Sequence, residues 1–265
     1  MKTERDLRWT PFVALLDREI QRFLKVIVQT VITPFVSSVL YLLIFGVSLG
    51  RQITMKEGVP YLSFLIPGLV MMGCLNNAFQ NSSSSVVTSK FSGDLEDLKV
   101  APLSFWQIIL ALSVAGVVRG LIVGGIIFLV GEAFHYWLYS AWLLPHSPVV
   151  LLLSLLLGGL TFANVGISVA FWARTFDQMS AVSGFILTPL IYLGGVFFSI
   201  EGLPEWVRKI SLFNPLLYMI NGVRYGVLGR ADVDFATALG VATAAFLLTL
   251  VVAINSLRRG SFQRW

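Results

Sequence analysis

Few residues in this 265-residue chain could carry out acid–base or nucleophilic catalysis. There are two histidines, His135 and His146, and one cysteine, Cys74. Residues 46–50 read GVSLG and match the G-x-S-x-G pattern of serine hydrolases, which also requires a strand-to-helix turn, an acid and a histidine close by. Here the pattern ends a long apolar segment, and both histidines are expected on the connector after the third such segment. The match therefore does not indicate a hydrolase.

Nucleotide and metal chemistry also lack their usual motifs. No G-x-x-x-x-G-K-[ST] is present, so the chain has no P-loop with which to bind ATP. No H-E-x-x-H motif and no cysteine cluster points to a metal site. The sequence predicts a protein that is not an enzyme and holds no metal or cofactor of its own.

One arginine, Arg119, lies near the middle of an apolar segment, where a charge costs about 2.5–3.5 kcal/mol on membrane-insertion scales. No Asp or Glu falls in the middle of such a segment. Arg119 could form hydrogen bonds that join neighbouring helices, or it could contact an acidic headgroup that moves along a transport pathway. Around it, Gly116, Gly120 and Gly124 form a small-x-x-x-small pattern that favours close helix packing.

A second polar feature begins in the inner half of the second apolar segment. Asn77, Asn81, Ser84 and Thr88 share one helix face, at i, i+4, i+7 and i+11. Lipid offers no hydrogen-bond partners to such side chains, so they must face protein or water. They either join helices or line an aqueous vestibule.

The composition identifies the solvent in which these groups must be positioned. Hydrophobic residues make up 56% of the chain and charged residues 12%, against about 45–50% and about 25% in soluble domains. The net charge of +5 could fit a nucleic-acid-binding protein, but the basic residues flank apolar segments. The sequence therefore predicts an integral membrane protein with no nucleic-acid partner.

Six segments are long and apolar enough to cross about 30 Å of hydrocarbon as helices. They are too long and continuous for barrel strands, which would alternate over about ten residues. We therefore predict an all-α integral membrane protein, with residues 1–265 forming a single transmembrane domain. The predicted transmembrane helices are residues 26–49, 61–82, 106–130, 149–173, 179–199 and 235–256.

The basic residues predict the orientation of these spans. With six spans, 12 of the 19 Lys and Arg residues fall on the side of the termini and 6 on the other, while Arg119 lies within a span. The positive-inside rule then places both termini in the cytoplasm, as in a multi-pass protein of the bacterial inner membrane. If residues 210–229 also crossed, the basic tail would lie outside, so we predict that residues 201–229 form an outer re-entrant helical hairpin.

An amphipathic helix is predicted over residues 10–25. Thr10 and Pro11 favour a helix start, as a hydroxyl cap followed by proline at the first helical position. Apolar residues repeat along one side, and Arg18 and Arg22 lie on the other. Such a helix lies in the interface of the lipid bilayer, and it either only anchors the chain or also docks a cytoplasmic partner.

The largest predicted inner loop spans residues 88–105. Asp94, Glu96 and Asp97 make its short helix acidic, and Leu95 and Leu98 are expected to form a small apolar face. This segment is either a solvated connector or a short helix that docks into a groove of a partner protein.

The second half of the chain resembles a known family. Its ordered elements are TFDQ at residues 175–178, PLIYLGGVFF at 189–198, LPEW at 203–206, FNP at 213–215 and RYG at 224–226. This order resembles the permease subunits of type-2 ATP-binding-cassette exporters, which move polysaccharides, lipid-linked glycans and amphipathic drugs. Together with the N-terminal helix and the loop that ends at Pro102, the resemblance covers nearly the whole chain.

The resemblance implies a transmembrane permease that pairs with a second copy as a homodimer. Two separate nucleotide-binding subunits would bind ATP and Mg²⁺ and drive export of an amphipathic substrate from the inner side outward. The surfaces these subunits would grip, the N-terminal helix and the inner loop, contain the candidate coupling residues Arg18, Arg22, Asp94, Leu95, Glu96, Asp97 and Leu98. Candidate pathway and gate residues are Asn77, Asn81, Arg119, Tyr192, Phe197, Phe198, Asn214 and Pro215.

An ion-coupled secondary transporter is the alternative. Such a protein usually shows internal repeats and ionisable residues at the midplane of the membrane. Here Arg119 is the only such residue. The expected function is therefore the permease of an ATP-driven exporter.

Overall fold

The computed structural model describes residues 4–50 and 58–259, without the side chains of residues 4–8, 96, 97 and 99. Every regular element in these ranges is helical, which confirms the all-α prediction. The elements are α1 (Glu4–Leu24), α2 (Ile27–Tyr41), η1 (Leu42–Leu49), α3 (Tyr61–Ser92), α4 (Asp94–Val100), α5 (Phe105–Tyr139), α6 (Pro148–Trp172), α7 (Phe176–Val182), η3 (Ser183–Leu187), α8 (Thr188–Leu193), η4 (Ile200–Gly202), α9 (Glu205–Leu212), α10 (Pro215–Leu228) and α11 (Phe235–Arg259).

In the described ranges, five helices are long and apolar enough to cross a membrane. They are α2 with η1, α3, α5, α6 and α11, which match the first four predicted spans and the sixth. Three of them are longer than predicted, because α3 continues to Ser92, α5 to Tyr139 and α11 to Arg259. As a result His135 lies in α5, so the expectation that both histidines lie on the connector is wrong.

The fifth predicted span, residues 179–199, is the irregular one. The chain is helical from Phe176 to Leu193, but η3 interrupts it as a π-helical turn. Pro189 has no N–H to donate to the Phe185 carbonyl. In the turn before it, the backbone N–H and the hydroxyl of Thr188 both donate to the Ser183 carbonyl, the hydroxyl at 2.9 Å. The helix ends at a turn in which Gly195 has a φ of 85°. This segment is therefore helical in three consecutive pieces, and it is not among the five candidate spans.

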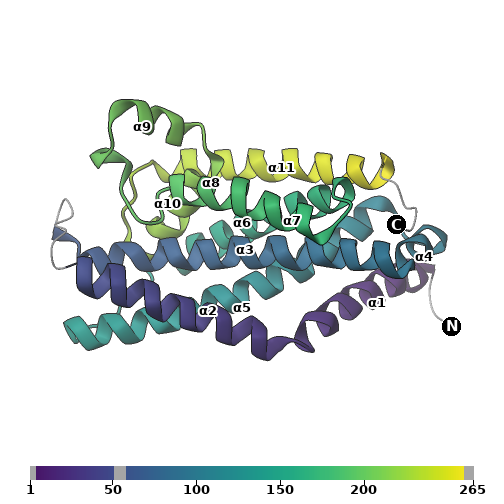
Figure 1. Cartoon of the computed structure of the whole chain (residues 1–265), viewed down its shortest axis with the longest axis horizontal. Coiled ribbons are helices and arrows are strands. Elements are labelled where there is room, and N and C mark those ends of the chain that lie inside the picture. Colours follow the sequence, from purple (N-terminus) through teal and green to yellow (C-terminus); the bar gives the residue numbers. More distant parts are fainter. Residues whose placement is uncertain (1–3, 51–57, 260–265) are drawn as a thin grey trace.

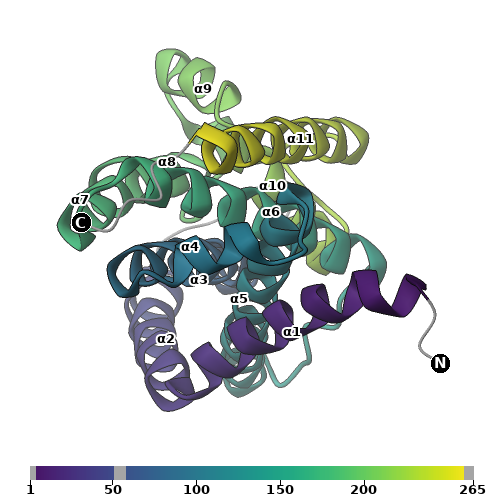
Figure 2. The same ribbon diagram turned by 90° about the vertical axis from the view of Figure 1, so that its right-hand side faces the viewer.

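The long helices run side by side, with α3 at the centre of the bundle (Figures 1 and 2). In its most apolar stretch 83% of α3 is buried, against 22% for α2 with η1 and 17% for α11. The start of α1, α4 and the end of α11 lie toward one end, which we call the α4 end. The opposite end carries α9 and is called the α9 end.

The predicted glycine stripe is a packing surface between α5 and α3. A Cβ atom added at Gly120 would lie 2.7 Å from the Cys74 carbonyl oxygen, and one at Gly116 would collide with the Ser82 hydroxyl. Only glycine allows the two backbones to approach this closely. Gly116 packs next to Ala78 and Gly120 next to Cys74 on α3. This contact also sets the height of Arg119, which lies between the two glycines in the sequence of α5.

The N-terminal helix α1 begins at Glu4, so the predicted start at Thr10 is wrong and Pro11 lies inside the helix. A proline within a helix costs a backbone hydrogen bond but does not have to end the helix. Figures 1 and 2 show α1 running obliquely across the α4 end, where it packs on α5. Leu15 and Phe23 are buried, and between them the carboxylate of Glu19 is buried as well.

Helix α4 is held by the bundle through its two leucines. Leu95 and Leu98 are buried in a hydrophobic core shared with α1, α3, α5, α6 and α11. The small apolar face predicted for α4 is thus covered by other helices of the same chain. Asp94 and Val100 are exposed.

The hairpin predicted over residues 201–229 consists of η4, α9 and α10. Trp206 on α9 is exposed, whereas most of α10 is buried against α3, α6, α8 and α11. Asn214 caps α10 by accepting a hydrogen bond from the Leu216 N–H at 3.1 Å, and Pro215 occupies the first turn. Asn214 also donates to the Leu190 carbonyl at 2.6 Å, which joins α10 to α8.

Candidate functional site

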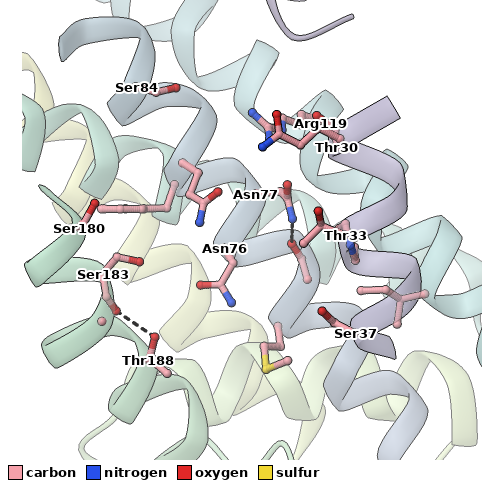
Figure 3. Close-up of a pocket in the computed structure, with 18 of the residues that line it drawn as sticks. Thr30, Thr33, Ser37, Asn76, Asn77, Ser84, Arg119, Ser180, Ser183 and Thr188 are labelled. Atoms are coloured by element: carbon pink, nitrogen blue, oxygen red, sulfur yellow. Dashed lines mark hydrogen bonds between the residues drawn. The ribbon is translucent and has the colours of Figure 1, made fainter. Parts of the chain in front are cut away.

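A cavity of about 890 Å³ lies beside α3, between α2 on one side and α7, η3 and α8 on the other (Figure 3). It exists because α2 packs on α5 whereas its continuation, η1, packs on α3. The middle of α2 therefore stands away from α3. The lining runs along α3 from Leu69 to Ser84, which spans about 22 Å at 1.5 Å per helical residue.

Short polar side chains from three walls reach into this cavity (Figure 3). They carry hydroxyl or carboxamide groups that can donate or accept hydrogen bonds. The first wall is α2, the second is α3 and the third is the segment from α7 to α8. The residues are Gln29, Thr30, Thr33, Ser37, Ser38, Asn76, Asn77, Gln80, Ser84, Ser180, Ser183 and Thr188. On α2, Thr30, Thr33 and Ser37 recur at i, i+3 and i+7. This spacing is visible in the sequence, but we did not predict a site from it.

The candidate pathway residue Arg119 lines this cavity from α5. It is partly buried, and its Nε is buried with no hydrogen-bond partner among the described residues. In the part of the chain that the structure describes, no carboxylate lies within 4 Å of its guanidinium.

A second arginine, Arg22, enters the cavity from the end of α1. Its Nε donates to the Glu19 carboxylate at 3.1 Å, and its Nη2 donates to the Asn81 carbonyl at 2.8 Å. Its Nη1 donates to the Ser84 hydroxyl at 3.3 Å. Arg22, expected at a partner surface, therefore joins α1 to α3 at the cavity.

The Glu19 carboxylate is the centre of this connection. It accepts a hydrogen bond from the Ser85 hydroxyl at 2.6 Å and another from Arg18 at 3.3 Å. Buried carboxylates are costly unless they are paired and hydrogen-bonded, and this one is both. We did not predict it, although Leu15, Glu19 and Phe23 follow i, i+4, i+8 spacing and place an acid on the apolar face.

The polar face predicted on α3 divides between two roles. Asn77 and Ser84 line the cavity, which supports the vestibule interpretation for them. Asn81 is fully buried outside the cavity and accepts from Arg22, so it joins helices. Thr88 is exposed.

An aromatic cluster around Phe197 lies at the end of the cavity nearer the α9 end. Tyr41 lines the cavity and packs against Phe197, with ring centroids 5.8 Å apart. Phe45 and Tyr192 also contact Phe197, at 5.0 and 5.4 Å. The Tyr61 hydroxyl donates to the Phe197 carbonyl at 2.8 Å and fixes the turn. The predicted gate residues Tyr192 and Phe197 therefore meet here, and Phe198 follows in the same turn, half-buried.

A buried arginine in α10 holds the α9 end together. Arg224 is 2% exposed and donates to the Gly195 carbonyl at 2.7 Å. Its guanidinium lies 3.8 Å from the Asp232 carboxylate and 3.8 Å above the Phe64 ring. Asp232 in turn accepts from the Ile200 N–H at 3.1 Å. One side chain thus connects α10, α3, the turn after α8 and the segment before α11.

The structure also brings a histidine and a serine together. His135 Nε2 lies 3.0 Å from the Ser63 hydroxyl, and His135 Nδ1 lies 2.7 Å from the Ala141 carbonyl. Both side chains are buried and neither lines the cavity. A nucleophile that substrate cannot reach is not catalytic, so this pair joins α3, α5 and the loop after α5.

The remaining candidate coupling residues lie at the α4 end. Arg18 is half exposed at its side chain, and Asp94 is exposed. The side chains of Glu96 and Asp97 lie outside the described residues. Lys90, which we did not predict, is buried and donates to the carbonyls of Ala170 and Phe171 at 2.6 and 2.9 Å. It thereby caps the end of α6, where a cation is favoured.

These features define a class of protein: a multi-pass helical membrane protein with a polar cavity open beside its central helix. Residues 10–228 match the family model of the ABC-2 type transporter, and the chain belongs to that family. It is accordingly a transmembrane permease of an ABC transporter, the membrane component and not the ATPase itself.

Related proteins agree with this assignment. The chain is 37% identical over 259 residues to the inner membrane transport permease YadH of Escherichia coli K12, an alignment that covers 96% of this chain and 97% of that protein. It is 23% identical over 256 residues to nodulation protein J of Rhizobium leguminosarum bv. viciae, covering 96% and 95%. The chain is thus a multi-pass inner membrane protein.

Proposed function

We propose that two copies of this chain form the membrane part of an ATP-driven exporter for an amphipathic substrate. Two nucleotide-binding subunits bind ATP and Mg²⁺ and drive it. The observation that carries this proposal is the cavity beside α3 in a chain of the ABC-2 family. Its volume falls within the roughly 300–1,000 Å³ typical of small-molecule sites, and it mixes polar with apolar walls.

In this proposal the α4 end faces the cytoplasm, with both termini there. The charge distribution supports this orientation, because Arg18, Arg22, Arg258 and Arg259 all belong to elements at the α4 end. The segment from α7 to α8 is the remaining crossing, α1 lies in the inner interface and η4 to α10 form a re-entrant outer hairpin. The whole chain then forms a single permease domain.

The pathway starts in the cavity and is closed toward the outside by the Phe197 cluster. Since α2, α3 and the α7–α8 segment line the cavity, the second copy would complete it from the open side. ATP can open the pathway only by binding one arrangement of the nucleotide-binding subunits better than another. The movement of these subunits would be transmitted to the cavity through α1, because Arg22 is a residue of α1 and also lines the cavity.

The cavity argues against a proton-coupled secondary transporter. Proton coupling needs a group that releases its proton near neutral pH, such as a carboxylate or histidine. The charged groups among the lining residues are Arg22 and Arg119, and arginine stays protonated in proteins.

Reconstitution tests the proposal directly. Vesicles that contain the chain together with its nucleotide-binding subunits should move a fluorescent amphiphile only when ATP and Mg²⁺ are supplied. The matched control carries a nucleotide-binding subunit whose P-loop lysine is replaced. Transport by the chain alone on a proton or sodium gradient would overturn the proposal and favour the secondary transporter.

Charge reversal in α4 tests the coupling role of this helix. The variant E96K/D97K should lose most ATP-driven transport while it inserts normally, because partner contact through an acidic helix depends on charge complementarity. Transport and ATPase rates should be measured together, with E201K/E205K as the control, since Glu201 and Glu205 are exposed on the hairpin. Unchanged transport in E96K/D97K would remove α4 from the coupling surface.

A further inference from the structure

The cavity carries an unbalanced positive charge. Arg22 and Arg119 line it, and among the residues that the structure describes no aspartate or glutamate does so. Like charges that line one cavity repel each other. Glu19 lies behind Arg22, outside the cavity, and divides its carboxylate between Arg18, Arg22 and Ser85. A net positive charge therefore remains in the cavity.

The two arginines differ in how they are held. Arg22 is fixed by Glu19, Asn81 and Ser84, so its position is set before any ligand arrives. Arg119 has a buried Nε without a hydrogen-bond partner. A partly buried guanidinium beside a like charge is stabilised when an anion lies between the two. The cavity thus contains the guanidinium of Arg22, which the protein holds in place, and the guanidinium of Arg119, which has an N–H group left to donate.

The neighbouring groups favour an anion rich in acceptor oxygens. Thr30 and Gln80 line the same cavity and can donate hydrogen bonds. Arginine binds phosphate through two parallel N–H···O bonds, which gives it both strength and directionality. Two arginines also match the charge of a phosphomonoester or diphosphate better than that of a single carboxylate.

The cavity is also amphipathic along its length. The fixed arginine lies near Ser84, toward the α4 end, whereas Leu69 and Met72 line the part nearer the α9 end. Ile127 contributes an apolar wall from α5. A ligand with an anionic head would place its head at the arginines and its apolar chain beside these residues.

We propose that Arg22 and Arg119 form a binding site for a phosphate-bearing headgroup within this cavity. The proposal rests on the proposed function, of which it specifies the substrate class. A phosphorylated lipid and a soluble phosphate compound share the chemistry that the arginines recognise, and the experiment separates these two sources.

Native mass spectrometry of the purified full chain, with nucleotide-binding subunits where they co-purify, is the test. Phosphatidic acid, a phosphomonoester lipid, should be retained at least about tenfold better than phosphatidylcholine, whose choline masks the phosphate charge. Inorganic pyrophosphate is the soluble probe and is added as a competitor. Displacement of phosphatidic acid by pyrophosphate assigns the site to the phosphate group itself, and retention of the lipid despite pyrophosphate assigns it to a phosphorylated lipid.

The variants R119Q and R208Q make the test specific to the cavity. Both lose one positive charge, but Arg208 is exposed on α9 and outside the cavity. R119Q should weaken retention of phosphatidic acid by about tenfold, whereas R208Q should leave it unchanged. The comparison of lipids on the wild-type chain needs no variant, so it stands even if R119Q folds poorly.

Equal retention of phosphatidic acid and phosphatidylcholine, with no binding of pyrophosphate, would overturn the proposal, as would unaltered retention in R119Q. The binding assay uses no ATP. Phosphate-dependent binding without ATP-driven transport would therefore contradict only the proposed function. ATP-driven transport without such binding would contradict only this inference.

Discussion

Replacing Arg224 with methionine should sharply reduce the amount of folded protein recovered from the membrane. The side chain is 2% exposed and joins four parts of the α9 end through Gly195, Asp232, Asn221 and Phe64. Methionine fills similar space but leaves the Gly195 carbonyl and the Asp232 carboxylate without their cation. Removing one partner of a buried ion pair costs about 3–5 kcal/mol, a large share of the stability of a typical protein.

Thermal unfolding of the purified protein in detergent, followed by size-exclusion chromatography, measures this effect. R208M is the matched control, because Arg208 is exposed on the neighbouring helix α9. The double variant R224M/D232N should recover part of the lost stability, since it also removes the carboxylate left unpaired. A melting temperature of R224M equal to that of the wild type would show that the ion pair does not hold the α9 end.

The long helices could be predicted because their signal lies in continuous sequence. A run of about 20 apolar residues has few alternatives to a spanning helix. The ends of α3 and α5 were missed because there the helices continue into sequence with polar residues. Lys90 and Glu132 are tolerated in them only through partners that are distant in sequence, namely the end of α6 and the Leu143 N–H. The break at η3 likewise depends on one proline and one threonine.

The candidate site was predictable where a residue is unusual by itself. Arg119 is a charge in an apolar run, and Asn77 belongs to a polar stripe, and both line the cavity. Arg22 was predicted at a partner surface because a basic residue on an amphipathic helix normally faces solvent or headgroups. Its contacts with Asn81 and Ser84 join residues about 60 positions apart, which sequence periodicity does not reveal. Arg224 was predicted only as part of an outer hairpin for the same reason.

Neutralising Glu19 should release α1 from α3, with the largest effect of any single substitution at the cavity. In E19Q the charge that holds Arg22 at 3.1 Å is lost, and the Ser85 hydroxyl loses its ionised acceptor at 2.6 Å. The guanidinium of Arg22 then lacks its counter-ion. At about 3 kcal/mol, the low end for a broken buried pair, local opening of α1 becomes about a hundredfold more frequent.

Hydrogen exchange of α1 amides, read by mass spectrometry, measures this opening. The control D17N removes the same charge from an exposed position two residues away and should leave the exchange rate unchanged. S85A in the wild-type background should accelerate exchange less than E19Q does, because it removes one hydrogen bond and no charge. Arg22 is a residue of α1 and also lines the cavity. Faster exchange in E19Q but not in D17N would therefore indicate that α1 and the cavity are structurally coupled through the Glu19–Arg22 contact. Equal rates in both variants would instead mean that the apolar contacts of Leu15 and Phe23 hold α1 by themselves.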